Sequence, residues 1–302
     1  MADATATATA TATASVGELA AASQVARHAV IAQVLREAQP YIETLRGRTL
    51  VIKLGGSTLD NQRDALEDIV WLRGLGAHPV LVHGGGPEIN DWLERVGLPR
   101  RFERGLRVTD AATLDIVRMV LAGKVNGDLV RLLVSLGGRA IGLSGIDGGL
   151  LHARQIAADL GYVGAISTVD AGVITALSAA SFIPVIAPIA LGDGDTVLNV
   201  NADDAAADLA RGLSATKLLY LSDVPGVLDA QGRLLSELTD HEVRALIDQG
   251  VISGGMIPKA EAALRALETT ERVHIVDGRE PHVLIRELFT HEGAGTMIRR
   301  AR

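Results

Sequence analysis

Two lysines beside glycine-rich turns are the residues of this sequence best suited to chemistry. Lys53 ends the apolar run of VIKLGGSTLD (Val51–Asp60) and is followed, after one leucine, by Gly55 and Gly56. Glycines after a strand allow a ligand, often a phosphate, to approach the backbone closely. A P-loop places its lysine after the glycines, in G-x-x-x-x-G-K-[ST], whereas this lysine precedes them. The loop is therefore not a P-loop.

The second lysine, Lys259, lies in SGGMIPKAEAAL (Ser253–Leu264), where a glycine loop precedes a helix that starts at Pro258. A cation in the first turn of a helix interacts unfavourably with the helix dipole. Lysine takes such a position when an anion nearby compensates for it, or when its side chain reaches solvent. The pattern leaves both interpretations open.

HGGGP (His83–Pro87) is a strand end followed by three glycines and by a proline, which is favoured at the first helical position. The N–H groups of such a loop can turn toward a ligand, and the helix N-terminus adds partial positive charge. We expect an anion-binding loop here. A tight connection in which only glycine fits is the alternative.

GLRVTD (Gly105–Asp110) places Arg107 between two apolar residues and provides Thr109 as a helix cap. An arginine held in this way suits bidentate binding of a carboxylate. An ordinary structural ion pair explains the same pattern equally well.

LNVNADDAAADLA (Leu198–Ala210) alternates Asn199 and Asn201 on one side of a short extended piece and then opens a helix. Either Asn201 or Asp203 is expected to cap this helix. Polar side chains at such a strand–helix corner can also point into a cleft. With the glycine loops and the two lysines, they supply what phosphoryl transfer needs, because its catalysis is positioning plus electrostatic stabilisation.

Short apolar runs that alternate with helical patterns indicate how these residues are positioned. Such runs, apolar on both faces, are typical of a parallel sheet between two layers of helices. We therefore predict an α/β fold, a three-layer αβα sandwich with a mainly parallel central sheet. The predicted strands are TLVIKL, HPVLVH, RAIGLSG, FIPVIAPI, TKLLYLSD and RVHIVDG. The loops KLGG, HGGG, LSGIDGG and YLSDVPG follow strands, so they should gather at the carboxyl edge of the sheet, where ligands bind.

The chain is expected to have four parts. Residues 1–24 are an Ala/Thr-rich tail that we expect to be disordered and that resembles neither a signal nor a transit peptide. Residues 25–47 show helical spacing interrupted by Pro40, which predicts a kinked amphipathic helix. Residues 48–195 and 196–302 are expected to form an amino-terminal and a carboxy-terminal lobe.

Composition excludes several functional classes. The 302 residues carry a net charge of −7, so nucleic acid is not an expected partner. The absence of cysteine removes disulfides, thiolate metal sites and cysteine nucleophiles and fits a cytoplasmic protein. The uncharged segment 171–192 is about long enough to span a membrane, but Pro184 and Pro188 favour a helix to about Ala180 and then a buried strand.

Taken together, the motifs resemble the N-acetylglutamate kinases of the amino acid kinase family. VIKLGG, VHGGGP, GLRVTD, GLSGIDGG, LNVNADDAA, LSDVPGVLD and SGGMIPKAEAAL occur in the order seen there, over residues 25–298. GLRVTD with NVNAD is more specific than the glycine loops. Ile146 departs from the pattern, because many relatives carry lysine there, and it receives no charge role.

The resemblance implies roles for individual residues. Lys53 and Lys259 would stabilise the transferring phosphoryl group, and Asp203 would orient both lysines. Gly55, Gly56, Gly85 and Gly86 would offer backbone N–H groups to phosphate and acceptor carboxylate, while Arg107 and Asn199 would hold the substrate's α-carboxylate and acetamido group. The nucleotide would lie near Ser222, Asp223, Gly226, Ser253, Gly254, Gly255 and Met256.

The implied reaction is the ATP-dependent phosphorylation of the γ-carboxylate of N-acetyl-L-glutamate in arginine biosynthesis. This carboxylate, with a pKa of about 4.3, is ionised at pH 7, so no general base is required. Mg²⁺ would arrive with ATP, and we expect no metal held by the protein alone.

The resemblance extends to regulation. The early helix resembles the extension of arginine-sensitive members, which links dimers into a hexamer, so a homo-oligomer, dimer or hexamer, is expected. L-arginine would bind near the ending ELFTHEGAGTMI. The residues implied are Tyr41, Lys217, His282, Glu292, Gly293 and Gly295.

Two other functions stay open at this stage. A kinase of N-acetyl-aminoadipate, or of its carrier-protein form in lysine biosynthesis, differs by one methylene in the acceptor, which discriminates by only about 1–3 kcal/mol. A non-catalytic arginine-responsive binding protein is the second, although it would need none of Lys53, Asp203 and Lys259. Carbamate, aspartate and uridylate kinases lack GLRVTD and NVNAD, and HGGGPE is not a dinucleotide-binding fingerprint.

Overall fold

The computed structural model describes the backbone of residues 16–55 and 63–301, and the side chains within these ranges from residue 28 onward. The chain divides into two compact units, Met1–Thr44 and Leu45–Arg302. Of the predicted site residues that the structure describes, all except Tyr41 belong to the second unit. Gly56 lies outside the described residues.

The described part of the first unit is helical. Helix α1, Val16–Leu45, begins earlier than the expected start at residue 25 and contains Pro40. Residues 1–15 of the Ala/Thr-rich tail lie outside the described residues. Apolar side chains of α1 are half or more exposed, at 60% for Val30, 50% for Ile31, 56% for Val34 and 62% for Leu35. An exposed apolar stripe of this kind is typical of a helix that packs against a partner.

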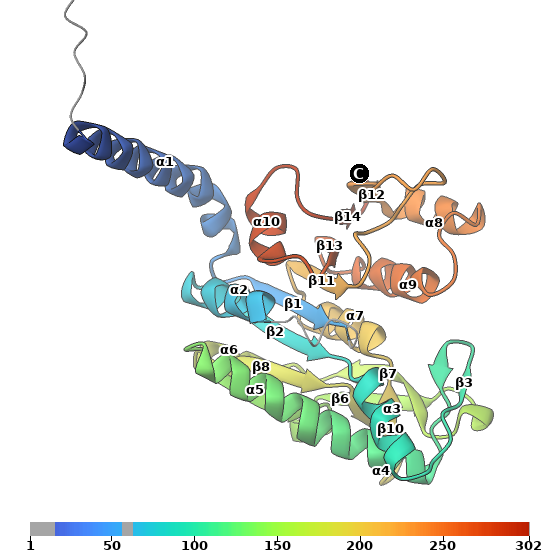
Figure 1. Ribbon diagram of the computed structural model, residues 1–302. Coiled ribbons are helices and arrows are strands. Elements are labelled where there is room, and N and C mark those ends of the chain that lie inside the picture. Colours follow the sequence, from blue (N-terminus) through green and yellow to red (C-terminus); the bar gives the residue numbers. More distant parts are fainter. Residues whose placement is uncertain (1–15, 56–62, 302) are drawn as a thin grey trace, which may run out of the picture. The chain divides into compact units, whose positions relative to one another are not determined.

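An eight-stranded sheet forms the centre of the second unit (Figure 1). Neighbouring strands are parallel except for the pair of β13 and β14, which is antiparallel. In spatial order the strands are β12 (Glu237–Thr239), β14 (Thr296–Arg299), β13 (Arg272–Asp277), β11 (Lys217–Ser222), β1 (Thr49–Leu54), β2 (His78–His83), β8 (Ile183–Ala187) and β5 (Ala140–Ser144).

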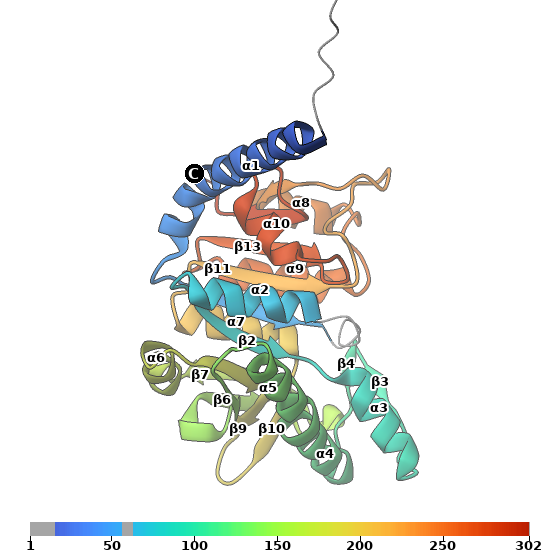
Figure 2. The same ribbon diagram turned by 60° about the vertical axis from the view of Figure 1, so that its left-hand side comes forward.

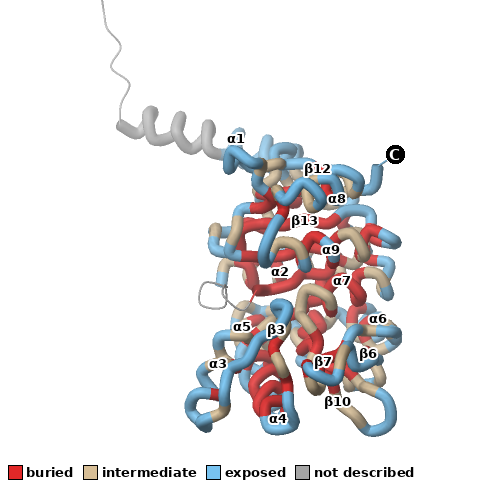
Figure 3. The backbone as a smooth tube through the Cα atoms, turned by 90° about the vertical axis from the view of Figure 1, so that its right-hand side faces the viewer, coloured by how far each residue is buried: buried red, intermediate tan, exposed pale blue. Residues whose placement is uncertain are grey.

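Helices cover both faces of this sheet. Leu50, Ile52 and Leu54 of β1 face one hydrophobic core and Val51 faces the other, because side chains alternate along a strand. The first core contains α2 (Arg63–Gly74), α3 (Gly86–Arg95), α4 (Ala111–Arg118), α5 (Asn126–Ser135) and α10 (Val283–Phe289). The second contains α6 (Gly172–Ala179), α7 (Ala202–Gly212), α8 (Asp240–Asp248) and α9 (Met256–Ala266). Figure 2 shows α2 and α5 in front of the sheet, and Figure 3 shows that the central strands of the sheet are buried.

Smaller elements surround the central sheet. Four strands close into a small barrel, β6 (Leu151–Gln155), β7 (Val163–Val169), β9 (Ile189–Leu191) and β10 (Val197–Val200). Strands β3 (Phe102–Glu103) and β4 (Leu106–Arg107) form a hairpin. Helical turns lie at Met119–Val125, Asp147–Gly149 and Ala158–Leu160.

The predicted three-layer sandwich is confirmed, and each predicted strand is present. The barrel was not predicted. In the segment 171–192, helix α6 ends at Ala179 and the buried strand β8 follows, as expected from the prolines. Over the described part of the chain, no helix has both the length and the apolar character needed to cross a membrane. The predicted lobe boundary at 195/196 stays a prediction.

Candidate active site

Lys53, Asp203 and Lys259 come from three different elements and meet at one point. The Nζ of Lys53, near the end of β1, lies 2.7 Å from Oδ1 of Asp203 on α7. The Nζ of Lys259, on α9, lies 2.7 Å from Oδ2 of the same carboxylate. One carboxylate therefore bridges two ammonium groups, and residues separated by more than 200 positions in the sequence form a single charged cluster.

This cluster is shielded from water. Lys53 and Lys259 are 8% and 7% exposed. Burial alone would raise the pKa of Asp203, but the two lysines outweigh it and lower that pKa to about 2. Burial lowers the pKa of Lys259, and Asp203 opposes this effect. At neutral pH the carboxylate is ionised, and one negative charge faces two positive ones.

The ends of two helices explain how these side chains are held. Asn201 is the N-cap of α7, because its side chain accepts hydrogen bonds from the N–H groups of Asp203 (2.8 Å) and Asp204 (3.3 Å). Asp203 is therefore not the cap, and its carboxylate is available to the lysines. Lys259 lies in the first turn of α9, against the helix dipole, and Asp203 is the compensating anion.

Tyr220, which no sequence motif indicated, contacts this cluster. Its hydroxyl donates a hydrogen bond to the backbone oxygen of Asp203 (3.1 Å), and the Nζ of Lys259 lies 4.8 Å from the centre of its ring. An aromatic residue within the leucine-rich strand KLLYLS was the available signal.

The glycine loop after β2 leads directly into α3. Gly86 is the first residue of α3 and Gly85 its N-cap, so their N–H groups lie where a helix lacks internal acceptors. A Cβ on Gly85 would lie 2.6 Å from Leu121, whereas a Cβ on Gly86 would meet nothing within 4 Å. The loop is thus packed on one side and has open space on the other, as an anion-binding loop requires.

His83 anchors this loop in its neutral form. Burial lowers the pKa of His83 to about 4. Its Nδ1 donates to the oxygen of Gly84 (2.8 Å), and its Nε2 accepts from Asn126 (3.1 Å). The ring serves as a structural support for the loop and carries no charge at neutral pH.

The N–H of Gly55, which was expected to bind phosphate, already makes a hydrogen bond within the protein. That N–H donates to the backbone oxygen of Leu221 at 3.0 Å, where it extends the pairing of β1 with β11. The expectation is wrong for this group, because strand pairing already uses the donor. No position is described for Gly56.

Arg107 lies at the end of β4, 8% exposed, with part of its guanidinium unsatisfied. Nη2 donates to the side chain of Asn90 (2.7 Å) and to the oxygen of Gly86 (3.3 Å), and the guanidinium carbon lies 4.7 Å from the ring centre of Phe102. Nη1 is buried and has no hydrogen-bond partner. No described carboxylate pairs with Arg107, so the interpretation as a structural ion pair does not hold within the described residues. A buried cation with a free donor is suited to a carboxylate ligand.

Asn199 is joined to the same region through Thr109. The side-chain amide of Asn199 donates to the hydroxyl of Thr109 (3.2 Å), and this hydroxyl donates to the backbone oxygen of Arg107 (2.9 Å). Thr109 therefore bridges β4 and β10, and Asp110 rather than Thr109 caps α4. The arrangement links the two residues that the resemblance assigns to the acceptor.

The residues assigned to the nucleotide lie on loops after β11 and before α9. Ser222 ends β11 and its hydroxyl lies 3.4 Å from the carboxylate of Asp223. Gly226 has a φ of 146°, and a Cβ there would lie 2.5 Å from Thr296, so only glycine fits. Ser253, Gly254 and Gly255 are exposed and precede Met256, the first residue of α9. Added Cβ atoms on Gly254 and Gly255 would meet nothing within 4 Å, so this loop leaves space for a ligand.

Two residues assigned to arginine, Lys217 and Gly295, are joined by a hydrogen-bonded chain through His274 and Glu287, which the sequence did not indicate. Nζ of Lys217 lies 3.2 Å from Nε2 of His274, and Nδ1 of His274 lies 2.5 Å from Glu287. The other oxygen of Glu287 accepts from the N–H of Gly295 (3.1 Å). Burial lowers the pKa of Lys217 to about 8. Glu292 is exposed, and Gly293 has a φ of 67°, with no room for a Cβ beside Glu287.

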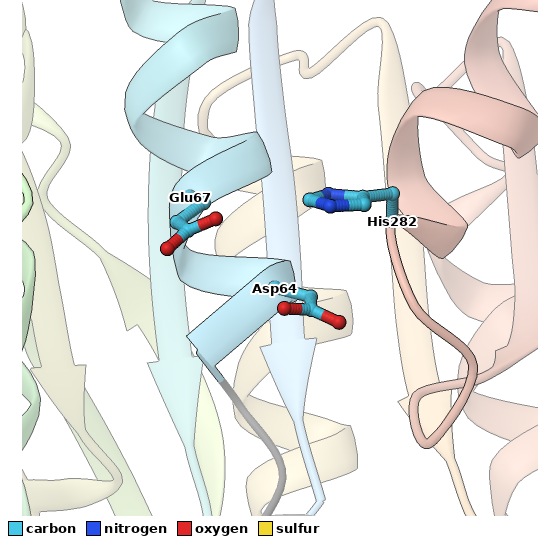
Figure 4. A group of neighbouring side chains, drawn as sticks. All are labelled: Asp64, Glu67 and His282. Carbon is cyan, nitrogen blue, oxygen red and sulfur yellow. The ribbon is translucent and has the colours of Figure 1, made fainter.

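His282 makes a different contact, with α2. Its Nδ1 lies 2.8 Å from the buried carboxylate of Asp68, which raises the pKa of His282. Figure 4 shows its ring directed toward Asp64 and Glu67, and potential ligand atoms of these three residues lie within 4.8 Å of one another. The guanidinium of Arg63 pairs with Glu67 (3.0 Å) and supplies positive charge to this group. Tyr41 belongs to the first unit.

The fold and the buried lysine pair define a class of phosphoryl-transfer proteins, and the chain belongs to the amino acid kinase family. The model of that family matches residues 48–277. Curated relatives include the acetylglutamate kinase of Halorhodospira halophila, 46% identical over 286 residues, which cover 89% of this chain and 95% of that protein. The acetylglutamate kinase of Thermoanaerobacter pseudethanolicus is 48% identical over 276 residues, which cover 88% and 92%. The resemblance inferred from the motifs is confirmed.

Solved structures agree with this assignment. N-acetylglutamate synthase from Neisseria gonorrhoeae, in complex with coenzyme A and N-acetyl-glutamate, has a TM-score of 0.81 at 30% identity. The match covers 90% of this chain but 64% of that longer chain, less than two thirds of its length. Carbamate kinase from Giardia lamblia bound to AMP-PNP has a TM-score of 0.63 at 18% identity, covering 84% and 99%. The second similarity shows the shared fold.

Proposed function

We propose that this protein transfers the γ-phosphoryl group of ATP to the γ-carboxylate of N-acetyl-L-glutamate, as a step of arginine biosynthesis. The observation that carries the proposal is the pair of buried lysines joined through Asp203. The similarity to proteins named acetylglutamate kinase supports the choice of acceptor.

Because the reaction brings two anions together, the active site must supply positive charge. A carboxylate oxygen attacks the γ-phosphorus, a new oxygen–phosphorus bond forms, and the bond to the β-phosphate oxygen breaks to release ADP. The acceptor is already ionised at neutral pH, so no residue has to remove a proton. Lys53 and Lys259 stabilise the charge spread over the transferring group, and Asp203 keeps both ammonium groups directed at it.

Mg²⁺ fits this site as a partner of the nucleotide. Both oxygens of Asp203 contact lysine ammonium groups, so this carboxylate does not serve as a metal ligand. Mg²⁺ bound to the ATP phosphates adds charge neutralisation at the phosphoryl group when ATP binds. The loops at Ser222–Gly226 and Ser253–Met256 are the proposed nucleotide contacts.

The acceptor is held by Arg107, Asn199 and the loop at Gly85 and Gly86. The unsatisfied Nη1 of Arg107 suits the α-carboxylate of the acceptor. The amide of Asn199 suits the acetamido group. Thr109 joins these two residues and fixes the spacing between the two ends of the acceptor.

Arg107→Lys tests this assignment. We expect the KM for N-acetylglutamate to rise by about one to two orders of magnitude, because lysine keeps the charge but loses the planar fork. The KM for ATP should change less than twofold. The matched control is Arg101→Lys, which alters an exposed arginine paired with Asp110 (3.4 Å). An equal rise of both KM values would contradict a specific role at the acceptor.

The reaction itself is tested by trapping the acyl phosphate with hydroxylamine. Purified protein and Mg-ATP are incubated in parallel with N-acetylglutamate, glutamate and N-acetyl-aminoadipate, and the hydroxamate is measured. A strong signal with N-acetylglutamate alone supports the proposal. A stronger signal with N-acetyl-aminoadipate overturns it in favour of lysine biosynthesis, and no signal with any acceptor from folded protein that binds ATP favours a carrier-protein substrate or a binding protein.

We further propose feedback inhibition by L-arginine and assembly through α1. The chain from Lys217 through His274 and Glu287 to Gly295 offers charged and backbone groups near Glu292 and Gly293. His282, which the resemblance also implies, makes a hydrogen bond with Asp68 on α2. The exposed stripe Val30, Ile31, Val34 and Leu35 supports pairing of α1 with a second copy, giving a dimer or hexamer.

Arginine is expected to lower the rate by at least fivefold at millimolar concentration, and Lys217→Met should weaken this response. Initial rates are measured against arginine for both proteins, with Lys124→Met as a control that removes an exposed lysine. A flat rate curve for the wild type would remove the proposed inhibition.

A further inference from the structure

Tyr220 contacts Asp203 and Lys259 and lies beside Lys53 at the centre of the site. It is the register partner of Lys53, since β1 and β11 pair with Lys53 opposite Tyr220. Its hydroxyl donates to the backbone oxygen of Asp203 (3.1 Å). The ammonium of Lys259 lies 4.8 Å from the centre of its ring.

Tyr220 occupies a buried position on a strand whose neighbouring residues are leucines. Tyr220 is fully buried, as are Leu218, Leu219 and Leu221 on the same strand. A leucine would fill the space with apolar atoms but offer neither a π face nor a hydroxyl. The tyrosine therefore supplies two polar contacts that the packing of the strand does not require.

The two contacts act on different parts of the charged cluster. A cation over an aromatic face is attracted most strongly when both are removed from water, as Lys259 and Tyr220 are here. The hydroxyl ties the first turn of α7, which carries Asp203, to β11. Burial and the nearby Asp203 raise the pKa of Tyr220 well above its ordinary value, so the hydroxyl stays protonated and donates.

We propose that Tyr220 is a positioning residue, which holds the Lys259 ammonium and the first turn of α7 where both lysines can meet the phosphoryl group. The proposal rests on the proposed kinase function for its effect on rate. Tyr220 acts through Lys259 and Asp203 and has no part in bond making. Its ring accounts for most of the effect, because the ring contacts the charged atom directly.

Three variants separate the ring, the hydroxyl and simple packing. Tyr220→Phe keeps the ring, Tyr220→Met removes ring and hydroxyl while filling most of the space, and Leu218→Ala removes packing on the same face of β11. We expect kcat to fall about ten- to thirtyfold in Tyr220→Met and less than fivefold in Tyr220→Phe, with both KM values within twofold. Leu218→Ala should lower the melting temperature and leave kcat within twofold. A kcat within twofold of wild type in Tyr220→Met, or an equal loss in Leu218→Ala, would overturn the proposal.

A spectroscopic readout tests the contact without any activity. The lysines of the chain are Lys53, Lys124, Lys217 and Lys259, so spectra of ¹³C-lysine-labelled protein are simple, and Lys259→Arg assigns the signal. The Cε protons of Lys259 should be shifted upfield by the ring in wild type and in Tyr220→Phe, and should return to the ordinary position in Tyr220→Met. If wild type forms no hydroxamate but shows this shift, the proposed function fails and the contact stands. An unshifted signal in the wild type overturns the contact itself.

Discussion

Lys259→Ala is expected to lower kcat by two to three orders of magnitude. Removing one preorganised stabiliser of transition-state charge at a comparable site costs roughly 10²–10³ in rate. Lys259 is buried and bound to Asp203 at 2.7 Å, so no solvent-exposed cation can replace it easily. Steady-state rates at saturating ATP and N-acetylglutamate measure the effect.

The matched control removes the same charge at the surface. Lys124 pairs with Asp128 at 2.9 Å on an exposed helical turn, with 53% of its side chain exposed. Lys124→Ala should leave kcat within twofold. A kcat for Lys259→Ala within tenfold of wild type would show that this lysine does not stabilise the transferring group.

Asp203→Asn is expected to reduce both activity and stability. The substitution leaves two buried ammonium groups without their common counter-charge, which costs about 3 kcal/mol of unfolding free energy. The lysines then repel each other, so we expect kcat to fall at least about a hundredfold. Urea unfolding and steady-state rates of the folded variant measure the two effects.

The stability that Asp203 contributes to the folded protein should decrease at low pH. Because the pKa of Asp203 is lowered to about 2 from 3.8, its contribution is fully present above about pH 4 and is lost as pH falls through about 2. The shift corresponds to about 2 kcal/mol. The stability difference between wild type and Asp203→Asn should shrink by this amount over that pH range.

Asp204→Asn is the control for Asp203→Asn. Asp204 is the next residue of α7 and pairs with Arg265, but it contacts neither lysine. We expect kcat to stay within about fivefold of wild type. If the two variants lose activity equally, the effect belongs to the first turn of α7 rather than to the lysine bridge.

Much of this architecture was predictable from the sequence. Runs such as TLVIKL and TKLLYLS are apolar on both faces, so they predicted buried parallel strands, and both are central strands of the sheet. The place of Lys259 against a helix dipole predicted either a compensating anion or a side chain that reaches solvent, and Asp203 is such an anion. These features depend on local residue types, which the sequence shows directly.

Other features depend on contacts between distant residues. The bridge from Lys53 through Asp203 to Lys259 was implied by resemblance alone, since spacing cannot say which residues meet in space. The role of Asn201 as the cap of α7 was one of two options until its hydrogen bonds were seen. Gly55 was expected to offer an N–H that strand pairing in fact uses.

The small barrel and the aromatic contact were missed for related reasons. Strand β6, LHARQ, mixes charged and apolar residues, so its pattern does not separate a strand from a loop. Tyr220 within KLLYLS looked like a core residue, which it is, and its contact with Lys259 arises from the packing of α9 on that face of the sheet.

Lys53 and Lys259 together are proposed to hold the transferring phosphoryl group. A crystal structure with Mg-ADP, aluminium fluoride and N-acetylglutamate would show this contact, because the fluoride complex imitates the group in transfer. We expect both Nζ atoms within hydrogen-bond distance of the fluorides, and the guanidinium of Arg107 on the α-carboxylate of the acceptor. A fluoride complex bound away from either lysine would overturn this role of the lysine pair.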